Sequence, residues 1–429
     1  MPRVTHADSP DADSPDADSP DFDCLGADCL GAVEFDTGPL AAAAASLVGD
    51  DAPGGDAPGG DPPPGAIVAV SIDDRVHYAT AGVAQRADVG GDIPVAMTWA
   101  ARTDAGSVTK IVATVASLMA LVDSGQVDVD DPVSRYLPAF NARETDTRVT
   151  TVRDLLEHRA GLWEWWPLYL SGARAEEAIA AAVALPRRYP RGEGRHYSDI
   201  GFILLGALVA HVAAEPLADA VRHLALEPFG LGQTRYATPV PGGPIAASSG
   251  GDAIERAMVD SGVPYPVGGS SRDFSGWRTH VLVGEVNDGN AFHAFGGAAG
   301  HAGLFTTAGD LLTFARGVLA SCQSEGPVRP ETARQFVAAG ADPGQALGFR
   351  IWRDDRAGGE VTGGSPDGAV AIGHTGFPGV AFAMLPDRKA VAVMVTNRLH
   401  TRGTPRATEP MWHLARAAAG NHLDQYGNP

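Results

Sequence analysis

Thr103-Asp104-Ala105-Gly106-Ser107-Val108-Thr109-Lys110, followed by an apolar run to Val122, is the stretch from which we interpret the fold and chemistry of this chain. Helical residues three positions apart share a face, so the Lys110 amine can reach the Ser107 hydroxyl. A serine hydroxyl becomes a nucleophile when a neighbouring base takes its proton, and lysine can be that base when its surroundings lower its pKa. The stretch therefore predicts a serine nucleophile at the start of a buried helix, where free N–H groups can hold an oxyanion.

Lysine is rare in this chain, and its rarity gives the pattern weight. Lys110 and Lys389 are the only lysines, and arginine provides the other basic side chains. Arginine stays protonated and cannot act as a base, so a lysine three residues after a serine favours a chemical role. Ser-x-x-Lys also arises by chance as a surface lysine after a helix cap, and that alternative stays open.

Composition indicates a soluble globular protein of one large domain or two, because 44% of the 429 residues are hydrophobic and 20% are charged. We find no apolar stretch that predicts a membrane span, and residues 1–8 lack the apolar core of a secretion signal. These features predict a cytoplasmic protein. The net charge is −20, and the sequence has no basic stripe that would neutralise phosphates. This composition disfavours a nucleic-acid partner.

The three cysteines, Cys24, Cys29 and Cys322, are too few for a disulfide framework. Cys24 and Cys29 have no histidine close by that would complete a zinc site. His158, His293 and His301 match no common ligand spacing. We therefore predict no metal and no cofactor.

Residues 1–65 read as a disordered acidic tail. Residues 4–65 contain fourteen acidic residues and no lysine or arginine, in short repeats rich in Asp, Pro and Gly. Such repeats bury too little apolar surface to offset the entropy of ordering. Within the tail, the alanine-rich stretch 41–48 could form a short helix that docks on the folded domain, which we place at residues 66–420.

The predicted fold class is α+β, with an antiparallel sheet of about five strands flanked by helices. Alternating or apolar runs bounded by turn residues predict the strands, at residues 67–72, 76–82, 368–376, 380–386 and 390–396. Short connections make neighbouring strands antiparallel, and the helix expected at 411–419 would cover the sheet.

The middle of the chain is predicted to be mostly helical with long loops. A Thr-capped helix begins near residue 150, and an apolar helical run follows Tyr197-Ser198-Asp199. Residues 241–300 are rich in Gly, Ser and Pro and are expected to form loops near the rim of the active site. Trp163, Trp165 and Trp166 either line an apolar substrate pocket or pack as a small cluster, and both alternatives stay open.

Three motifs in this order resemble the serine β-lactamase and penicillin-binding-protein-like superfamily, in its esterase-like branch related to class C β-lactamases. They are Ser107-x-x-Lys110, Tyr197-x-Asp199 and His374-Thr375-Gly376. Two further segments, 155–162 and 300–311, are similar to the superfamily's Leu-Leu-x-His-x-x-Gly-Leu stretch and its glycine-rich turn into a helix. The resemblance runs from about residue 66 to about residue 419.

The resemblance implies a sheet part at 66–118 and 300–420, with a mostly helical insert at 119–299. It also implies an acyl-enzyme on Ser107, with Lys110 and Tyr197 sharing the transfer of protons. The backbone N–H groups of Ser107 and Phe377 would hold the oxyanion. The residues implied to bind the substrate or the oxyanion are Asp199, His374, Thr375, Gly376 and Phe377.

Two departures from the superfamily pattern shape the expected substrate. Asp199 stands where an asparagine is usual, and a carboxylate cannot donate to a substrate carbonyl but can pair with Lys110 and keep it charged. His374 replaces a lysine and removes a fixed positive charge. We expect a small ester, amide or peptide substrate, with D-amino-acid peptidase or β-lactamase-type activity as alternatives. A catalytically silent binding protein that reuses the fold is a further alternative.

Overall fold

The five strands expected from the sequence form the centre of the main sheet in the computed structural model, which describes residues 31–49, 60–87, 93–143, 149–172, 174–236, 243–353 and 370–426. They are β2 (Gly65–Ile72), β3 (Arg75–Gln85), β11 (Ala371–Gly376), β12 (Val380–Leu385) and β13 (Ala390–Thr396). β13 pairs antiparallel with β2, so the amino-terminal hairpin and the carboxyl-terminal meander join in one sheet. The α+β fold class is confirmed.

The sheet is larger than expected. Among the described residues it has eight strands, in the order β1-β3-β2-β13-β12-β11-β10, with β4 also paired to β3. The additional strands are β1 (Ala32–Phe35), β4 (Val95–Ala96) and β10 (Arg350–Trp352). β1 runs parallel to β3, so the sheet is mixed rather than wholly antiparallel. These strands have two to four residues, too few to show a period-two pattern.

The prediction of a disordered tail over residues 1–65 is wrong for β1 and for α1 (Pro39–Val48), where the sequence suggested a docked helix. Leu40 and Leu47 of α1 are buried. The Asp36 carboxylate accepts hydrogen bonds from the N–H groups of Gly38 and Leu40 and so holds the start of the helix. Residues 1–30 and 50–59, which include Cys24 and Cys29, lie outside the described residues.

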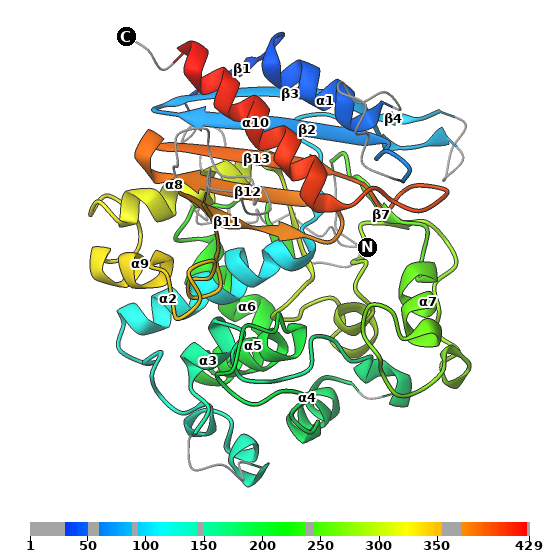
Figure 1. Cartoon of the computed structure of the whole chain (residues 1–429), viewed down its shortest axis with the longest axis vertical. Coiled ribbons are helices and arrows are strands. Elements are labelled where there is room, and N and C mark those ends of the chain that lie inside the picture. The colour runs from blue at the N-terminus through cyan, green and yellow to red at the C-terminus, as the bar shows by residue number, and fades with distance from the viewer. Residues whose placement is uncertain are drawn as a thin grey trace, which may run out of the picture.

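Helices cover both faces of the sheet (Figure 1). α1 and α10 (Thr408–Tyr426) pack on one face, where Val68 and Val70 of β2 meet them. α8 (Ala308–Ser321) packs on the other face, where Ile67 and Ala69 join the larger core. Because successive residues of a strand point to opposite faces, the apolar run of β2 fits a strand that is buried on both sides.

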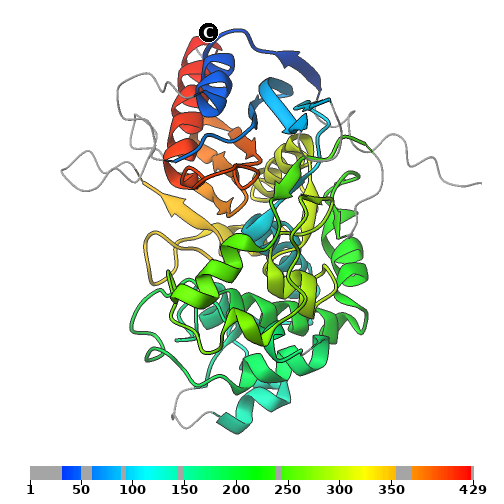
Figure 2. The ribbon, with the colours of Figure 1, turned by 90° about the vertical axis from the view of Figure 1, so that its right-hand side faces the viewer.

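The middle of the chain is mainly helical and lies at the end of the molecule away from α1 and α10 (Figure 2). Its helices are α2 (Ala116–Asp123), α3 (Val152–Leu156), α4 (Ala175–Ala184), α5 (Asp199–Ala213), α6 (Leu217–Val221), α7 (Ala253–Ser261) and α9 (Pro330–Val337). Two small sheets join them, formed by β5 (Thr103–Asp104), β6 (Arg235–Tyr236) and β9 (Leu304–Thr306), and by β7 (Ala247–Ser249) and β8 (Leu282–Val283). The region 241–300, expected to form loops, thus also contains α7 and two short strands.

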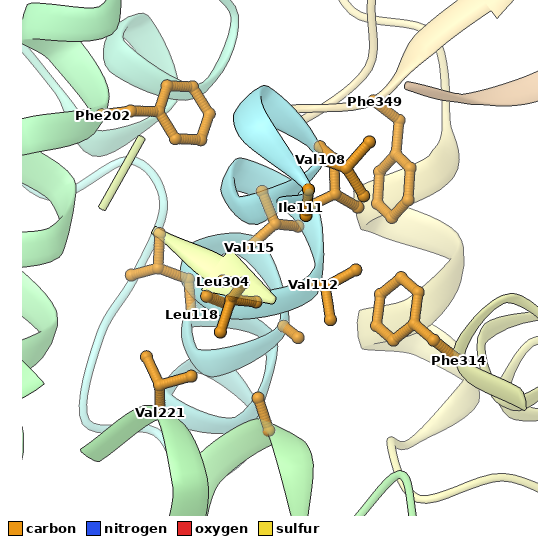
Figure 3. Packing of buried hydrophobic residues seen from close by; sticks show 14 of the residues in the cluster. Val108, Ile111, Val112, Val115, Leu118, Phe202, Val221, Leu304, Phe314 and Phe349 are labelled. Carbon is orange, nitrogen blue, oxygen red and sulfur yellow. The ribbon is translucent and has the colours of Figure 1, made fainter. Parts of the chain in front are cut away.

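The helix that follows the nucleophile motif runs through the centre of the larger core (Figure 3). It begins as a 3-10 turn, Gly106–Val108, continues as a π-helical turn, Lys110–Val115, and ends as α2. Phe202, Leu304 and Phe314 surround it in the close-up view. π-helical turns occur frequently at functional sites, because they shift the side-chain register of a helix.

This central helix is also apolar enough to cross a membrane by length and composition. The stretch is Gly106–Asp123, and 78% of it is buried inside the fold. Within the described residues, the bent pair Asp199–Ala213 and Leu217–Leu226 passes the same test only if its two helices, 81° apart, count as one span. Core helices of soluble proteins pass this test too, so it is weak evidence for a membrane span.

We predict that the Leu47→Ala variant loses about 2–5 kcal/mol of unfolding free energy, because the truncation leaves a cavity between α1 and the sheet. Urea unfolding of the full chain measures the loss. The control is Val33→Ala on β1, where the side chain is 39% exposed and a change within about 0.5 kcal/mol is expected. Equal, small losses in both variants would show that α1 contributes little to stability.

Candidate active site

The turn before Ser107 is fixed by a buried carboxylate. Asp104 accepts a hydrogen bond from the Gly106 N–H at 2.9 Å and another from the Asn287 N–H at 2.6 Å. Burial raises the pKa of Asp104 to about 6, against the opposing effect of these two hydrogen bonds. Asp104 thus caps the turn and also ties it to the Asn287 loop.

Two glycines let the nucleophile turn and the end of β11 approach each other closely. Gly106 has a φ of +50°, and a Cβ there would lie 2.3 Å from the Cδ of Pro378. A Cβ on Gly376 would lie 2.3 Å from the carbonyl oxygen of Ala105. Both contacts are too short for any side chain, so only glycine allows the His374-Thr375-Gly376 strand to lie against Ser107.

Lys110 is fully buried, and its ammonium group donates hydrogen bonds and forms an ion pair. Its Nζ lies 2.9 Å from Ser107 Oγ, 3.2 Å from the carbonyl oxygen of His301 and 2.7 Å from Asp199 Oδ1. Burial by itself lowers the pKa of Lys110, but the Asp199 carboxylate and the Tyr197 hydroxyl outweigh it, and the pKa is raised. Lys110 is therefore charged, in contrast to the lowered pKa that we expected for a base.

Tyr197 completes this group. Burial raises the pKa of Tyr197 and the nearby Asp199 carboxylate adds to the rise, which outweighs the lowering by the Lys110 charge and by hydrogen bonds to Lys110 and Ser107. Lys110 Nζ lies 5.0 Å from the centre of the Tyr197 ring. The structure thus brings together the hydroxyl, amine and phenol that the sequence motifs placed at positions 107, 110 and 197.

The start of α5 holds Tyr197 and Asp199 in place. Ser198 caps the helix, because its Oγ accepts from the Gly201 N–H at 3.0 Å and donates to the Trp163 carbonyl at 2.6 Å. The Ser198 N–H donates to Nδ1 of His158 at 3.0 Å, and the His158 ring packs 4.6 Å from the Tyr197 ring. Burial lowers the pKa of His158 well below its usual value, so the ring is neutral and can accept this bond.

The His374 strand lies on the other side of Ser107. The centre of the His374 ring is 5.9 Å from that of Tyr197, and Nδ1 of His374 lies 2.7 Å from the Thr375 carbonyl oxygen. Burial, and then the charge of Lys110, lower the pKa of His374 well below its usual value. His374 therefore adds no positive charge to the site, as its replacement of a lysine suggested.

Ser107, Tyr197 and Phe377 line two cavities with different charges. One cavity, the acidic cavity, has a volume of about 330 Å³, and its wall contains Asp and Glu side chains but no lysine or arginine. Its other lining residues are Asp104, Gly106, Trp165, Asp199, Ile254, Glu255, Met258, Pro264, Tyr265, Asn287, Asp288, Ala302 and Pro378. The other cavity, of about 400 Å³, contains no carboxylate, and its further lining residues are Arg195, Arg350, His374, Thr375, Gly376 and Thr408. The site residues predicted from the sequence line one or both of these cavities, with the exception of Lys110. The Lys110 side chain is fully buried.

Sequence reasoning missed several of the ionisable residues that line these cavities. Glu255, from α7, accepts from the Tyr169 hydroxyl and from the Gly289 N–H, both at 2.8 Å. Burial and the nearby Asp288 raise its pKa to about 8. Arg195 and Arg350 are two of thirty arginines, and nothing in the sequence marks them out. Only the expectation that region 241–300 reaches the rim pointed toward α7.

The tryptophan cluster combines both alternatives left open by the sequence. Trp165 lines the acidic cavity. Trp163 and Trp166 pack edge to face, with ring centres 4.9 Å apart. One tryptophan thus lines a cavity, and the other two pack against each other.

The candidate histidines serve separate polar contacts. Nε2 of His293 lies 3.1 Å from Asp252, and Nε2 of His301 lies 2.9 Å from Asp288. Within the described ranges, no group of three or more His, Cys, Asp or Glu side chains is arranged to hold a metal ion.

Comparison with known proteins adds evidence of a different kind. Residues 61–416 match the family described as Beta-lactamase. The chain is 30% identical over 359 residues to an N-acetylmuramyl-L-alanine amidase of Bacillus subtilis (strain 168), covering 79% of this chain and 78% of the relative. It is 28% identical over 361 residues to a putative D-alanyl-D-alanine carboxypeptidase of Escherichia coli (strain K12), covering 79% of each.

A solved structure shows the same fold. EstCE1, a hydrolase with promiscuous acyltransferase activity, superposes with a TM-score of 0.60 at 19% identity, covering 83% of this chain and 94% of that one. The predicted resemblance is thus confirmed by the matched residues and by the relatives. The chain belongs to the beta-lactamase family and is a serine hydrolase of that family.

Proposed function

We propose that this protein cleaves an ester or amide bond through an acyl-enzyme on Ser107. The observation that supports the proposal best is the 2.9 Å contact between Ser107 Oγ and Lys110 Nζ, at the meeting point of two cavities. A nucleophile needs a proton-transfer partner within hydrogen-bond reach, and a cavity beside it to receive the acyl group. Both conditions are met here.

In the proposed reaction, Ser107 Oγ attacks the substrate carbonyl and a tetrahedral intermediate forms. The backbone N–H groups of Ser107 and Phe377 hold the oxyanion, because the close approach at Gly106 places the Phe377 nitrogen beside the nucleophile turn. Lys110 and Tyr197 transfer the serine proton to the leaving group. Water then releases the acid and regenerates Ser107.

A silent binding protein would have less need of this arrangement. Burying an ammonium group is costly unless it is paired, and Lys110 is fully buried with its charge paired to Asp199 at 2.7 Å. A protein that only bound its ligand could fill the same space with an apolar side chain. Retention of the hydroxyl, amine and phenol in contact favours catalysis.

We predict that Ser107→Ala reduces hydrolysis of p-nitrophenyl esters by at least about 10³-fold, because the acyl-enzyme cannot form. A fluorophosphonate probe, followed by intact-mass spectrometry, measures covalent labelling of the same samples. Ser124→Ala, which removes an exposed hydroxyl at the end of α2, serves as the matched control and should be labelled like the wild type. Undiminished labelling of Ser107→Ala would place the nucleophile elsewhere.

A second candidate function is a peptidase or amidase acting on substrates with a free carboxylate. Arg195 and Arg350 face the cavity beside His374, and guanidinium groups bind carboxylates well. Arg350 lies 3.2 Å from Thr375 Oγ1 and 3.2 Å from Glu409, so it is held against the strand that flanks Ser107. The amidase and carboxypeptidase relatives support this candidate. β-Lactamase-type activity is less favoured, since His374 is neutral.

We predict that Arg350→Met lowers kcat/KM about 10- to 100-fold for a short D-peptide with a free carboxylate, relative to the same peptide with a carboxyl-terminal amide. Loss of a hydrogen bond to a charged group, worth about 1.5–3 kcal/mol, sets this range. The two peptides, p-nitrophenyl esters and nitrocefin form the assay panel. Arg329→Met, which removes a 56% exposed arginine paired with Asp123, is the matched control. An unchanged preference for the free carboxylate would remove Arg350 from substrate binding.

A further inference from the structure

Asp199 lies close enough to Lys110 to exchange a proton with it beside Ser107, with 2.7 Å between Nζ and Oδ1. Ser107 Oγ and the His301 carbonyl accept hydrogen bonds from Lys110 Nζ, Asp199 Oδ1 forms an ion pair with it at 2.7 Å, and the Tyr197 hydroxyl is a further partner. In this state Lys110 donates to Ser107 and cannot accept its proton. The resting geometry therefore contains no free base on lysine.

Tyr197 is the other base that the motifs allow, and its surroundings disfavour that role. Burial and the Asp199 carboxylate both favour the neutral phenol, and they outweigh the effect of Lys110. A phenolate at Tyr197 would place two negative charges close together in a buried site. The Asp199 carboxylate thus disfavours deprotonation of Tyr197 and also keeps Lys110 protonated.

Other charged and titratable groups surround Lys110 on every side. They are His158 after α3, His374 on β11, Asp288 in the loop before the 290–294 turn, and Tyr265 in the loop after α7. His158 and His374 are neutral, and Asp288 already pairs with His301 at 2.9 Å. Asp199 is therefore the carboxylate in direct contact with the lysine, at 2.7 Å.

We propose that Asp199 takes a proton from Lys110 when substrate fills the cavity, so that Lys110 becomes the base for Ser107 and Tyr197 serves only as the proton donor to the leaving group. This inference rests on the proposed acyl-enzyme at Ser107. Asp199 acts through Lys110 and is a positioning residue rather than a catalytic one. The proposal separates two roles that the motifs alone leave shared between Lys110 and Tyr197.

Exclusion of water provides the driving force for the first proton transfer. The Asp199 side chain is 18% exposed and lines the acidic cavity, whereas Lys110 has no exposure. Water in the cavity stabilises the ion pair relative to the neutral pair of amine and carboxylic acid. A bound acyl group removes that water, and in a less polar site two charged groups become more costly than two neutral ones.

The steps balance. Lys110 passes a proton to Asp199 and becomes a neutral amine, which then takes the proton of Ser107 as the Oγ–carbon bond forms. When the tetrahedral intermediate breaks down, the Tyr197 hydroxyl donates its proton to the departing nitrogen or oxygen as that bond to carbon breaks. Tyr197 is reprotonated by Lys110, and Lys110 by Asp199. The net result is transfer of the serine proton to the leaving group, with the ion pair restored.

The first test is the pH dependence of acylation in Asp199→Asn. Without the carboxylate, burial lowers the pKa of Lys110, and the amine must lose its proton to solvent before it can act. We expect the rate of the p-nitrophenyl ester burst to fall about 10²-fold at pH 7 and to recover as the pH rises. The wild type should show no such recovery. Asp199→Glu, which keeps the carboxylate, should restore the profile of the wild type at a reduced rate.

Asp130→Asn is the matched control, because Asp130 also pairs with a basic residue, Arg153 at 2.7 Å, but lies outside both cavities. Its rate and its pH profile should equal those of the wild type. Acylation of Asp199→Asn within threefold of the wild type at pH 7, with the same profile, would overturn the proposal.

The second test compares leaving groups in Tyr197→Phe and does not depend on the Asp199 variants. p-Nitrophenolate leaves without a proton, whereas the amine of a matched anilide needs one. If Tyr197 is only the donor, the ratio of ester to anilide acylation rates rises at least tenfold in Tyr197→Phe. If Tyr197 is the base for Ser107, both rates fall together and the proposal is wrong.

Failure of the acyl-enzyme proposal would look different from failure of this inference. If the wild type shows no burst and no probe labelling at Ser107, both the assignment of Ser107 as nucleophile and the proposed role of Asp199 are wrong. If the wild type is acylated at Ser107 but the Asp199 and Tyr197 variants behave as the overturning outcomes describe, the nucleophile stands and only the proton path is wrong.

Discussion

The buried contact of Lys110 with both Ser107 and Asp199 is the interaction on which the rest of the site depends. An ammonium group without solvent is stable only when a counter-charge and hydrogen-bond acceptors surround it. Those partners come from three distant parts of the chain: the nucleophile turn, the start of α5 and the His301 loop. The fold must bring these parts together to within a few tenths of an ångström, because a misplaced carboxylate would leave an unpaired buried charge.

The scaffold around this contact is correspondingly rigid. Most of the central helix is packed within the larger core, and Lys110 has no exposure to solvent. At the start of the helix, the lack of a side chain on Gly106 and on Gly376 lets the turn before Ser107 touch the end of β11. The Asp104 carboxylate accepts a hydrogen bond from the Gly106 N–H and so holds this turn. On the facing side, the neutral His158 ring holds the cap of α5 through the Ser198 N–H. Neutral histidines and backbone hydrogen bonds thus position the charged groups without adding competing charge.

The sequence was informative where a residue type is required by chemistry or by periodicity. Ser107, Lys110 and Tyr197 could be proposed from the sequence because few side chains can do the chemistry expected of them. The strands β2, β3 and β11–β13 could be predicted because long apolar runs between turns have one simple interpretation. Short strands such as β1 and β10 show no period-two pattern, whereas the alanine-rich stretch of α1 suggested a helix although it lies in a segment of acidic repeats. Arg350 and Glu255 were missed for another reason. Their side chains are ordinary until the tertiary fold places them beside Ser107.

The two departures from the superfamily motifs both change the charge of the site. His374 lies close enough to Lys110 for the lysine charge, together with burial, to lower the pKa of His374. With a neutral His374, the positive charge on that side comes instead from Arg195 and Arg350, which reach the cavity from outside and are paired with Asp342 and Glu409. Asp199 then balances the remaining lysine. The site therefore has its positive charge at the rim of one cavity, an ion pair of Lys110 with Asp199 beside Ser107, and carboxyl side chains in the wall of the other cavity.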